Sequence, residues 1–427
     1  MAIAQTTATA EGKSMRRGIV KDYFPSLTHR DFRMLWTWTF VSNIGTWLHN
    51  VALGLYVHEV YRAPGWLGLI NFFSYAPTIL LFLPAGSLAD TGRRKRILIV
   101  SQVTMAAGAL SLAVLVAAGA AGLAGISISV FLMGIGIAFN FPAWLAIIPE
   151  LVPREDLLNA ISLNAASWNM ARFLGPMLAG IVIAIASYSA CFFANSASFF
   201  PFILVLFVIA LPETAASHAG STFSFRTMAG GISYSLRRRL IRNLLITFGL
   251  INAFGLPYIV FIPVFGKDIL SRGNIGVSAM YAASGLGAVV GAPLVTRLHR
   301  SFDEITLVKG GVMGISLSLL IFSWSTNFWL SLVLVFSAGL SFLVTATSIN
   351  TILQIKTDPR VRGRIMSLYV FMLVGAFPVG GALLGFIADA AGMSRAMSIG
   401  SLTCLFWGSV LLLKPELLQA AGVSDEI

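Results

Sequence analysis

Cysteine and charged residues are scarce in this 427-residue sequence, and their scarcity excludes several classes of protein. Only 11% of the residues are charged, and the two cysteines, Cys191 and Cys404, stand alone in apolar stretches. Two isolated cysteines give neither a disulfide framework nor a metal-ligand spacing. The sequence also lacks a Walker-type phosphate loop and a catalytic constellation. We therefore predict that the chain is not an enzyme and holds no cofactor and no metal.

Acidic residues are fewer than basic ones: 17 Asp and Glu stand against 29 Lys and Arg, for a formal net charge of +12. The basic residues are spread over short loops and form no single continuous patch, so we predict no nucleic-acid partner. If the N-terminus is cytoplasmic, 24 of the 29 basic residues lie in the tails and loops that face the cytoplasm. The positive-inside rule then places both termini in the cytoplasm.

Apolar residues are abundant in the sequence. Hydrophobic residues make up 57% of it, and the mean hydropathy is +0.84. A helix of about 20 apolar residues crosses the roughly 30 Å of a bilayer's hydrocarbon core. We predict an all-α membrane protein with twelve transmembrane helices. They are expected at residues 32–58, 66–88, 97–121, 124–148, 159–185, 188–211, 243–264, 276–296, 305–324, 328–353, 365–388 and 396–413.

The two halves of the sequence resemble each other at an offset of about 205 residues. This offset places Gly86 over Gly291 and, with a shift of one residue, Pro153 over Pro359. Such a repeat predicts two pseudo-symmetric six-helix bundles. The expected organisation is a cytoplasmic N-terminal tail (1–30), a first bundle (31–212), a cytoplasmic linker (213–242), a second bundle (243–414) and a cytoplasmic C-terminal tail (415–427).

The loop after the second span, from Gly86 to Arg96, reads GSLADTGRRKR. It resembles the G-x-L-a-D-x-x-G-R-[RK] loop of the major facilitator superfamily. Three further segments resemble its transmembrane secretion effector branch, which includes the enterobactin exporters: SNIGTW at 42–47, RFLGPMLAG at 172–180 and CFFAN at 191–195. The resemblance covers residues 28–414 and implies the twelve-helix fold of the superfamily, a place in the cytoplasmic membrane and a small-molecule substrate.

The resemblance also implies a gate at the cytoplasmic ends of the helices. In the superfamily the loop aspartate, here Asp90, binds the start of the eleventh helix when the cytoplasmic side is closed, and Arg362 and Arg364 stand there. The alternative is that Asp90 only balances neighbouring arginines. The gating motif consists of Gly86, Asp90, Gly92, Arg93, Arg94, Arg362 and Arg364.

Glycine and proline interrupt matching spans of the two halves. Gly175, Pro176 and Gly180 in the fifth span resemble the G-P-x-x-G-G motif of exporter subfamilies, with alanine in place of one glycine. Pro378, Gly380 and Gly381 interrupt the eleventh. Paired interruptions of this kind mark the moving interface of a transporter. Ordinary close packing of helices is the alternative reading.

Polar side chains inside spans need partners or water, so they are candidates for lining a central substrate cavity. Arg172 is the one basic residue near mid-membrane, where it is suited to bind an anionic group, to sense the gate or to serve a structural role. For each of the other positions, hydrogen bonding between helices is an equal alternative. The cavity candidates are Asn43, Thr46, His49, Asn50, Tyr75, Trp168, Arg172, Asn252, Ser341 and Thr345.

Protons are the expected coupling ion, although no Asp or Glu lies in the middle of any expected span. His49 is the mid-span group that ordinarily titrates near physiological pH, so it is a candidate proton carrier, with a buried neutral histidine as the alternative. Proton antiport therefore rests on the resemblance.

The leading interpretation is a monomeric secondary transporter that exports a small amphipathic molecule, a drug or a siderophore-like metabolite, by alternating access. Two alternatives stay open. One is a facilitator or importer of a polar nutrient such as a sugar, and the other is a non-transporting membrane sensor. Membrane lipid is the remaining expected partner.

Overall fold

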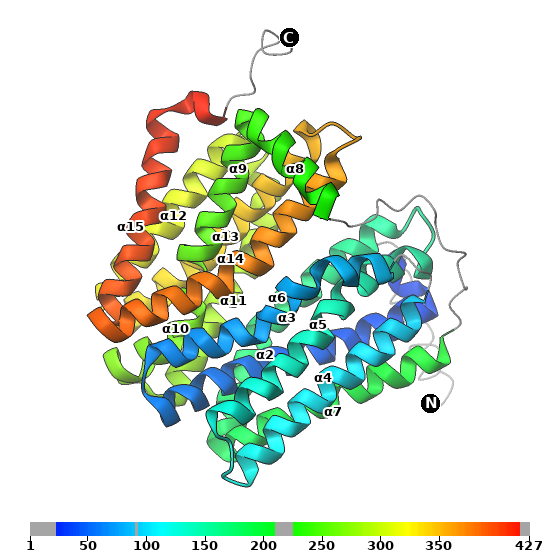
Figure 1. Cartoon of the computed structure of the whole chain (residues 1–427), viewed down its shortest axis with the longest axis vertical. Helices are drawn as coiled ribbons and strands as arrows, with labels where there is room; N and C mark the ends of the chain where they lie inside the picture. Colours follow the sequence, from blue (N-terminus) through cyan, green and yellow to red (C-terminus); the bar gives the residue numbers. More distant parts are fainter. Residues whose placement is uncertain (1–22, 90–92, 210–224, 419–427) are drawn as a thin grey trace, which may run out of the picture.

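The computed structural model describes residues 23–89, 93–209 and 225–418, and every regular element in these ranges is helical (Figure 1). The N-terminal half contains a 3₁₀ turn (Pro25–Thr28) and the helices α2 (Arg30–Tyr61), α3 (Pro64–Ala89), α4 (Arg94–Ala117), α5 (Leu123–Leu151), α6 (Leu157–Ile185) and α7 (Tyr188–Val208). The C-terminal half contains α8 (Phe225–Arg237), α9 (Arg239–Leu250), α10 (Tyr258–Val264), α11 (Gly273–Leu298), α12 (Glu304–Trp324), α13 (Phe328–Lys356), α14 (Arg362–Ala391), α15 (Met393–Leu413) and a 3₁₀ turn (Pro415–Leu418).

Ten helical stretches in the described ranges are long and apolar enough to cross a membrane, and the stretch Arg239–Ile269 counts as one of them. α2 and α3, with 32 and 26 residues, pack among these spans and bring the first half of the described chain to six, the number in the second half. Helices satisfy their own backbone hydrogen bonds, which is the requirement for a chain that crosses lipid repeatedly. The predicted fold class is therefore confirmed.

The two halves use the same pattern of helix contacts. In the first bundle α4 packs against α5 and α7, and α3 packs against α5. In the second bundle α12 packs against α13 and α15, and α11 packs against α13. The bundles meet along two equivalent pairs, α3 with α14 and α6 with α11 (Figure 1). The repeat in the sequence is thus a repeat in space.

The seventh span, predicted over residues 243–264, lies within the stretch Arg239–Ile269 and is interrupted by a π-helical turn. α9 ends at Leu250, a π-helical turn occupies Ile251–Gly255, and the helix resumes as α10 after Pro257. Proline has no N–H to continue the hydrogen-bond ladder, which favours a break here. π turns of this kind are frequent at functional sites because they redirect the side chains that follow.

The polar segment between the bundles also differs from a simple linker. α8 occupies Phe225–Arg237 within the expected linker of residues 213–242, and α9 begins at Arg239 instead of at 243. Residues 213–224 of that linker lie outside the described ranges, as do most of both tails.

The molecule has two unlike ends. We call the end that carries Tyr23 and Leu418 the terminus end, and the end with the shortest connections the opposite end. At the opposite end Ser187 and Asn327 cap α7 and α13 by accepting the N–H groups of Ala190 and Leu330. Gly392, with φ of 90°, makes the turn from α14 into α15 in a backbone conformation that favours glycine. Tight turns thus join the spans there.

The hydrophobic core is continuous across the bundles near the opposite end but not at the terminus end. One buried cluster includes Leu55 and Leu67 of the first bundle with Phe261 and Val277 of the second. A separate cluster around Phe32 and the buried Trp144 belongs to the first bundle alone and lies near the terminus end. Apolar packing therefore joins the bundles mainly at one end.

Glycines allow the helices of the two bundles to approach closely. A Cβ added to Gly68 on α3 would overlap the carbonyl oxygen of Gly381 on α14. A Cβ on Gly285 of α11 would lie 2.5 Å from the carbonyl oxygen of Arg172 on α6. Small residues at such crossings bring backbones into van der Waals contact, which is a main source of stability between membrane helices.

We predict that Gly68→Ala lowers the thermal stability of the purified protein, because the new methyl group has no space and overpacking costs about 1–3 kcal/mol. The measurement is the fraction of monodisperse protein after heating in detergent. Gly310→Ala on α12 is the matched control, since its Cβ would meet no described atom within 4 Å. Equal stability of the two variants would contradict the packing role of the α3–α14 crossing.

Candidate functional site

A polar cluster joins the two bundles halfway along their helices. Arg172, in the middle of α6, donates a hydrogen bond from Nη2 to Oγ of Ser284 on α11, at 3.0 Å. The hydroxyl of Tyr258, the first residue of α10, lies 2.6 Å from the same Oγ. Arg172 also interacts directly with the Tyr258 hydroxyl. The first bundle thus supplies the cation and the second bundle supplies two hydroxyl groups.

Aromatic rings surround this cluster. The guanidinium carbon of Arg172 lies 5.7 Å from the centre of the Trp47 ring on α2, a cation–π distance. Trp47 in turn packs edge-on against Trp168 of α6, with ring centres 6.1 Å apart. Tyr75 of α3 packs against Phe377 of α14, with ring centres 5.5 Å apart, and makes an aromatic contact across the bundles.

Arg172 is 9% exposed, and its partners in the described structure are all neutral. Ion pairs among the described residues involve other side chains. A charged side chain near the bilayer centre is costly and usually marks a substrate or ion pathway. The arrangement is therefore able to bind an anionic group brought by a ligand.

The structure places the cavity candidates in several different surroundings. Tyr75 and Arg172 lie at the interface of the bundles, and Trp168 packs against Trp47 within the first bundle. Asn43 and Thr46 on α2 are half-buried, and Asn50 is exposed. Asn252 is fully buried and donates to the carbonyl oxygen of Phe248 in its own span. Ser341 and Thr345 pack against Gly314 and Gly311 of α12, inside the second bundle and away from Arg172.

His49 also lies apart from the central cluster. Its side chain is 1% exposed, and its ring packs against Phe192 on α7, with ring centres 4.8 Å apart. Both ring nitrogens are buried without a hydrogen-bond partner in the described part of the chain. This position is inside the first bundle, so a role for His49 in carrying protons stays a prediction.

The gating motif is described only in part, because Asp90 and Gly92 lie outside the described ranges. Gly86 is half-buried in α3, and Arg93 is exposed before α4. Arg94 forms an ion pair with Glu150 and donates to the carbonyl oxygen of Ala146 on α5. Arg362 and Arg364 are exposed at the start of α14, where Arg364 lies against Gly230 and Gly231 of α8.

The predicted hinge glycines take part in close helix contacts. Gly175 faces Trp47 within the first bundle, while Gly180 faces Ser278 across the bundles. Gly380 lies against the backbone of Ala253, beside the break in the seventh span. Pro176 and Pro378 lie inside α6 and α14.

Sequence reasoning missed a layer of polar contacts between the bundles at the opposite end. Glu59, near the end of α2, accepts hydrogen bonds from Lys267 and from the Tyr188 hydroxyl, each at 2.6 Å. His58 Nε2 lies 3.0 Å from an oxygen of Asp268. Asp389 on α14 accepts the N–H of Gly65 on α3 at 2.9 Å. We call these contacts the opposite-end layer.

Ser284 and Tyr258 were also missed. Ser284 is one of many serines in the spans, and nothing in the sequence sets it apart. Tyr258 had a usable signal, because Gly255 and Pro257 interrupt the seventh span immediately before it. Such interruptions mark binding sites in transporters.

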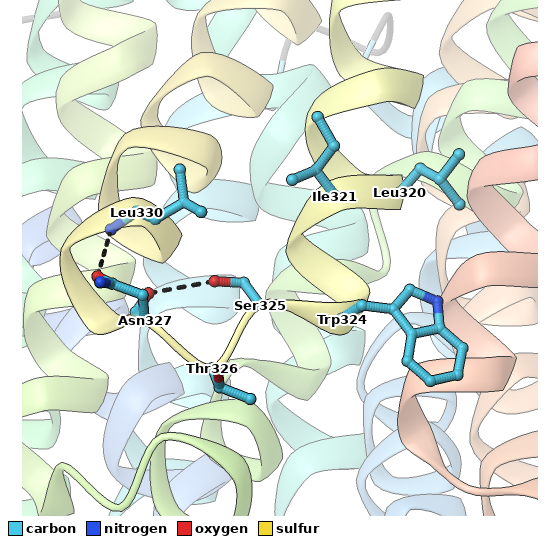
Figure 2. Close-up of a pocket in the computed structure, with 7 residues that line it drawn as sticks. All are labelled: Leu320, Ile321, Trp324, Ser325, Thr326, Asn327 and Leu330. Atoms are coloured by element: carbon cyan, nitrogen blue, oxygen red, sulfur yellow. Dashed lines mark hydrogen bonds between the residues drawn. The ribbon is translucent and has the colours of Figure 1, made fainter.

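A surface notch on the second bundle is unrelated to this cluster (Figure 2). It lies between α12 and α13 at the opposite end, around Trp324 and the capping residue Asn327. The exposed side chains of Ile321 and Leu330 border it, and the indole of Trp324 donates to Ser398 on α15. Its lining residues belong to one bundle, so the notch does not lie on a path between the two.

Twelve spans in two equivalent bundles, with a buried arginine bonded across their interface, define a multi-pass membrane transporter of the major facilitator superfamily. The chain belongs to the transmembrane secretion effector family, whose model matches residues 22–423. The predicted family is thereby confirmed, and with it a small-molecule substrate and the absence of enzymatic activity.

Two relatives are similar over nearly their whole length. The Staphyloferrin A transporter of Staphylococcus aureus is 24% identical over 368 residues, which cover 84% of this chain and 90% of the relative. The enterobactin exporter EntS of Escherichia coli is 23% identical over 390 residues, which cover 90% and 92%. Both relatives are bacterial, which is consistent with the predicted location in a cytoplasmic membrane.

Solved structures share the fold at low sequence identity. A bacterial homologue of the lysosomal transporter Spinster, in an inward-facing and occupied conformation, has a TM-score of 0.72 and 12% identity, with 92% of this chain and 97% of that chain covered. The nucleoside transporter NupG has a TM-score of 0.71 and 12% identity, with 90% and 98% covered.

We predict that Ser284→Ala lowers the stability of the protein, because it removes the acceptor of the Arg172 hydrogen bond at a buried site. A hydrogen bond to a charged group contributes about 1.5–3 kcal/mol. Thermal unfolding in detergent measures the effect. Ser162→Ala is the matched control, since exposed Ser162 bonds only to the backbone of its own helix. Indistinguishable melting curves would argue that the bond across the bundles contributes little.

Proposed function

We propose that this protein exports a small amphipathic, acidic metabolite of the siderophore type across the cytoplasmic membrane. The observation that carries the proposal is the buried Arg172, bonded to neutral hydroxyls of the other bundle. The likeness to two siderophore transporters over at least 84% of the chain supports the substrate class. The aromatic side chains Trp47, Trp168 and Tyr75 suit an amphipathic molecule with a flat apolar part.

Transport proceeds by alternating access of the two bundles in this proposal. The four polar contacts described above between the bundles lie between mid-membrane and the opposite end, where the apolar core is also shared. This distribution supports a state that is closed at the opposite end and accessible from the terminus end. With both termini cytoplasmic, as the positive-inside rule predicts, this is the state that loads an exported substrate.

The gate at the terminus end would form when the bundles close there. In the proposed cycle Asp90 then binds the start of α14, at Arg362 or Arg364. Both arginines are exposed in the present arrangement, and Arg364 lies against Gly230 and Gly231 of α8. Proton exchange supplies the driving force, with His49 as the candidate carrier inside the first bundle.

The first test of the function is export in Escherichia coli that lacks its own enterobactin exporter. We expect expression of this chain to raise the enterobactin content of the medium several-fold over that of cells with an empty vector, because the chain resembles the missing exporter over 90% of its length. Quantification of enterobactin by chromatography of the medium and of the cells measures the effect. A protonophore should abolish the increase if protons drive export.

Gly310→Ala is the control for expression and insertion, since it adds a methyl group in open space. Asp90→Asn tests the gate in the same cells. Unchanged enterobactin in the medium, together with normal amounts of protein in the membrane, would reject export of this siderophore. Uptake of a polar nutrient down its gradient would favour the facilitator.

The second test concerns the opposite-end layer. In a background with Cys191→Ala and Cys404→Ala, we place a cysteine at Ser278, which is 3% exposed and faces Gly180 of the other bundle. We predict that Lys267→Met speeds its reaction with an impermeant maleimide, added from the opposite side, by about two- to fivefold. The reason is that Glu59 loses a partner in the other bundle, and a partly exposed ion pair contributes about 0.5–1 kcal/mol.

Glu304→Gln is the control for the loss of one charged side chain. Glu304 faces His299 of the same bundle at 3.8 Å, so its loss breaks no contact between bundles. An equal rate for Lys267→Met and Glu304→Gln would show that the layer does not keep this end closed.

A further inference from the structure

We propose that Arg172, Ser284 and Tyr258 form an anion-binding subsite that is divided between the bundles, and that it takes an ionised oxygen of the transported molecule. The ligand class is an organic acid, with a carboxylate or an ionised hydroxyl. This inference rests on the proposed function and deepens it, because it assigns one end of the substrate to named residues of both bundles.

The geometry brings three groups to one point. α6 and α11 cross so closely at Gly285 that its Cβ would lie 2.5 Å from the carbonyl oxygen of Arg172. This crossing places the guanidinium 3.0 Å from Ser284 Oγ. The break in the seventh span places Tyr258 at the start of α10, with its hydroxyl 2.6 Å from the same oxygen. The three groups therefore share a single hydrogen-bonding centre, Ser284 Oγ.

The charge at this centre is uncompensated in the described structure. A guanidinium carries five N–H donors in a planar fork that matches a carboxylate. The described hydrogen bond from Arg172 goes to the hydroxyl of Ser284, which the Tyr258 hydroxyl also contacts. Hydroxyls are dipoles and leave the net charge in place, whereas an anionic oxygen would neutralise it and form a shorter, stronger hydrogen bond. The site thus favours an acid over its neutral ester or amide.

The position of the centre links binding to movement. Ser284 belongs to the other bundle, so the Arg172–Ser284 bond is also a bond between bundles. An anion that replaces Ser284 as the acceptor of Arg172 removes that bond, while the hydroxyls of Ser284 and Tyr258 turn to donate to the ligand. Binding of the substrate would then break the Arg172–Ser284 bond, which must also break when the bundles move apart. A ligand shifts a conformational equilibrium only if it interacts differently with the two states, and this exchange of partners is such a difference.

A charge-selective labelling experiment tests the subsite without a known substrate. The full-length protein carries Cys191→Ala, Cys404→Ala and Trp168→Cys. Trp168 is 48% exposed and lies one helical turn from Arg172, about 6 Å along the axis. Two methanethiosulfonate reagents are compared, one with an anionic sulfonate and one with a cationic trimethylammonium group. We expect Arg172→Gln to lower the ratio of anionic to cationic reaction rates by about tenfold.

Leu158→Cys is the matched control position. It is 77% exposed on the same helix but 14 residues away, about 21 Å, which is more than twice the Debye length of about 8 Å at physiological salt. Its rate ratio should not depend on Arg172. An unchanged ratio at Trp168→Cys, in protein that remains monodisperse, would overturn the proposal, because the arginine would then present no field to an arriving anion.

Measurement of export by Arg172 variants distinguishes a failure of this inference from a failure of the proposed function. If the chain exports enterobactin and Arg172→Lys exports less, the loss of the planar fork with charge retained supports the subsite. If Arg172→Gln exports as well as the unaltered chain, export stands and the subsite is wrong. If the rate ratio shifts as expected but no siderophore leaves the cells, the anion site stands and the siderophore substrate is wrong.

Discussion

The close crossing of α6 and α11 is the contact on which the rest of the interface depends. Glycine at position 285 lets the two backbones approach, and the approach brings the side chain of Arg172 to Ser284 of the other bundle. Lipid cannot solvate a guanidinium, so the charge must find protein groups, water or a ligand. One small residue thus allows a cation from one half of the repeat to be buried against the hydroxyls of the other.

The same interface is unequal along its length. Near the opposite end, apolar side chains of both bundles form one cluster, and Glu59, His58 and Asp389 add polar contacts across it. Near the terminus end the first bundle keeps a core of its own. In the proposed cycle the two similar bundles rock against each other along the α3–α14 and α6–α11 contacts. The central cluster contains residues of both bundles, so such a motion would change its contacts.

The architecture and the interface were predictable to different degrees. Apolar stretches of spanning length and the repeat of about 205 residues led directly to twelve helices in two bundles. Arg172 was recognisable because a lone cation in a span is costly wherever it faces. Ser341 and Thr345, by contrast, had the composition of cavity residues but pack against glycines of α12. Their polarity says nothing about the face on which they lie, because helix rotation is set by packing.

The sequence by itself therefore determined the spans, the repeat and the family, since these follow from the energy of apolar and charged groups in a bilayer and from motif spacing. It also marked Arg172 as a residue that needs a partner. Only the tertiary structure shows that Ser284 and Tyr258 lie at Arg172. Tyr258 and Ser284 lie 86 and 112 residues beyond Arg172 in the chain, and α6 meets α10 and α11 only where the bundles join. Contacts between distant segments depend on helix rotation and crossing angle, which a pattern of residue types does not encode.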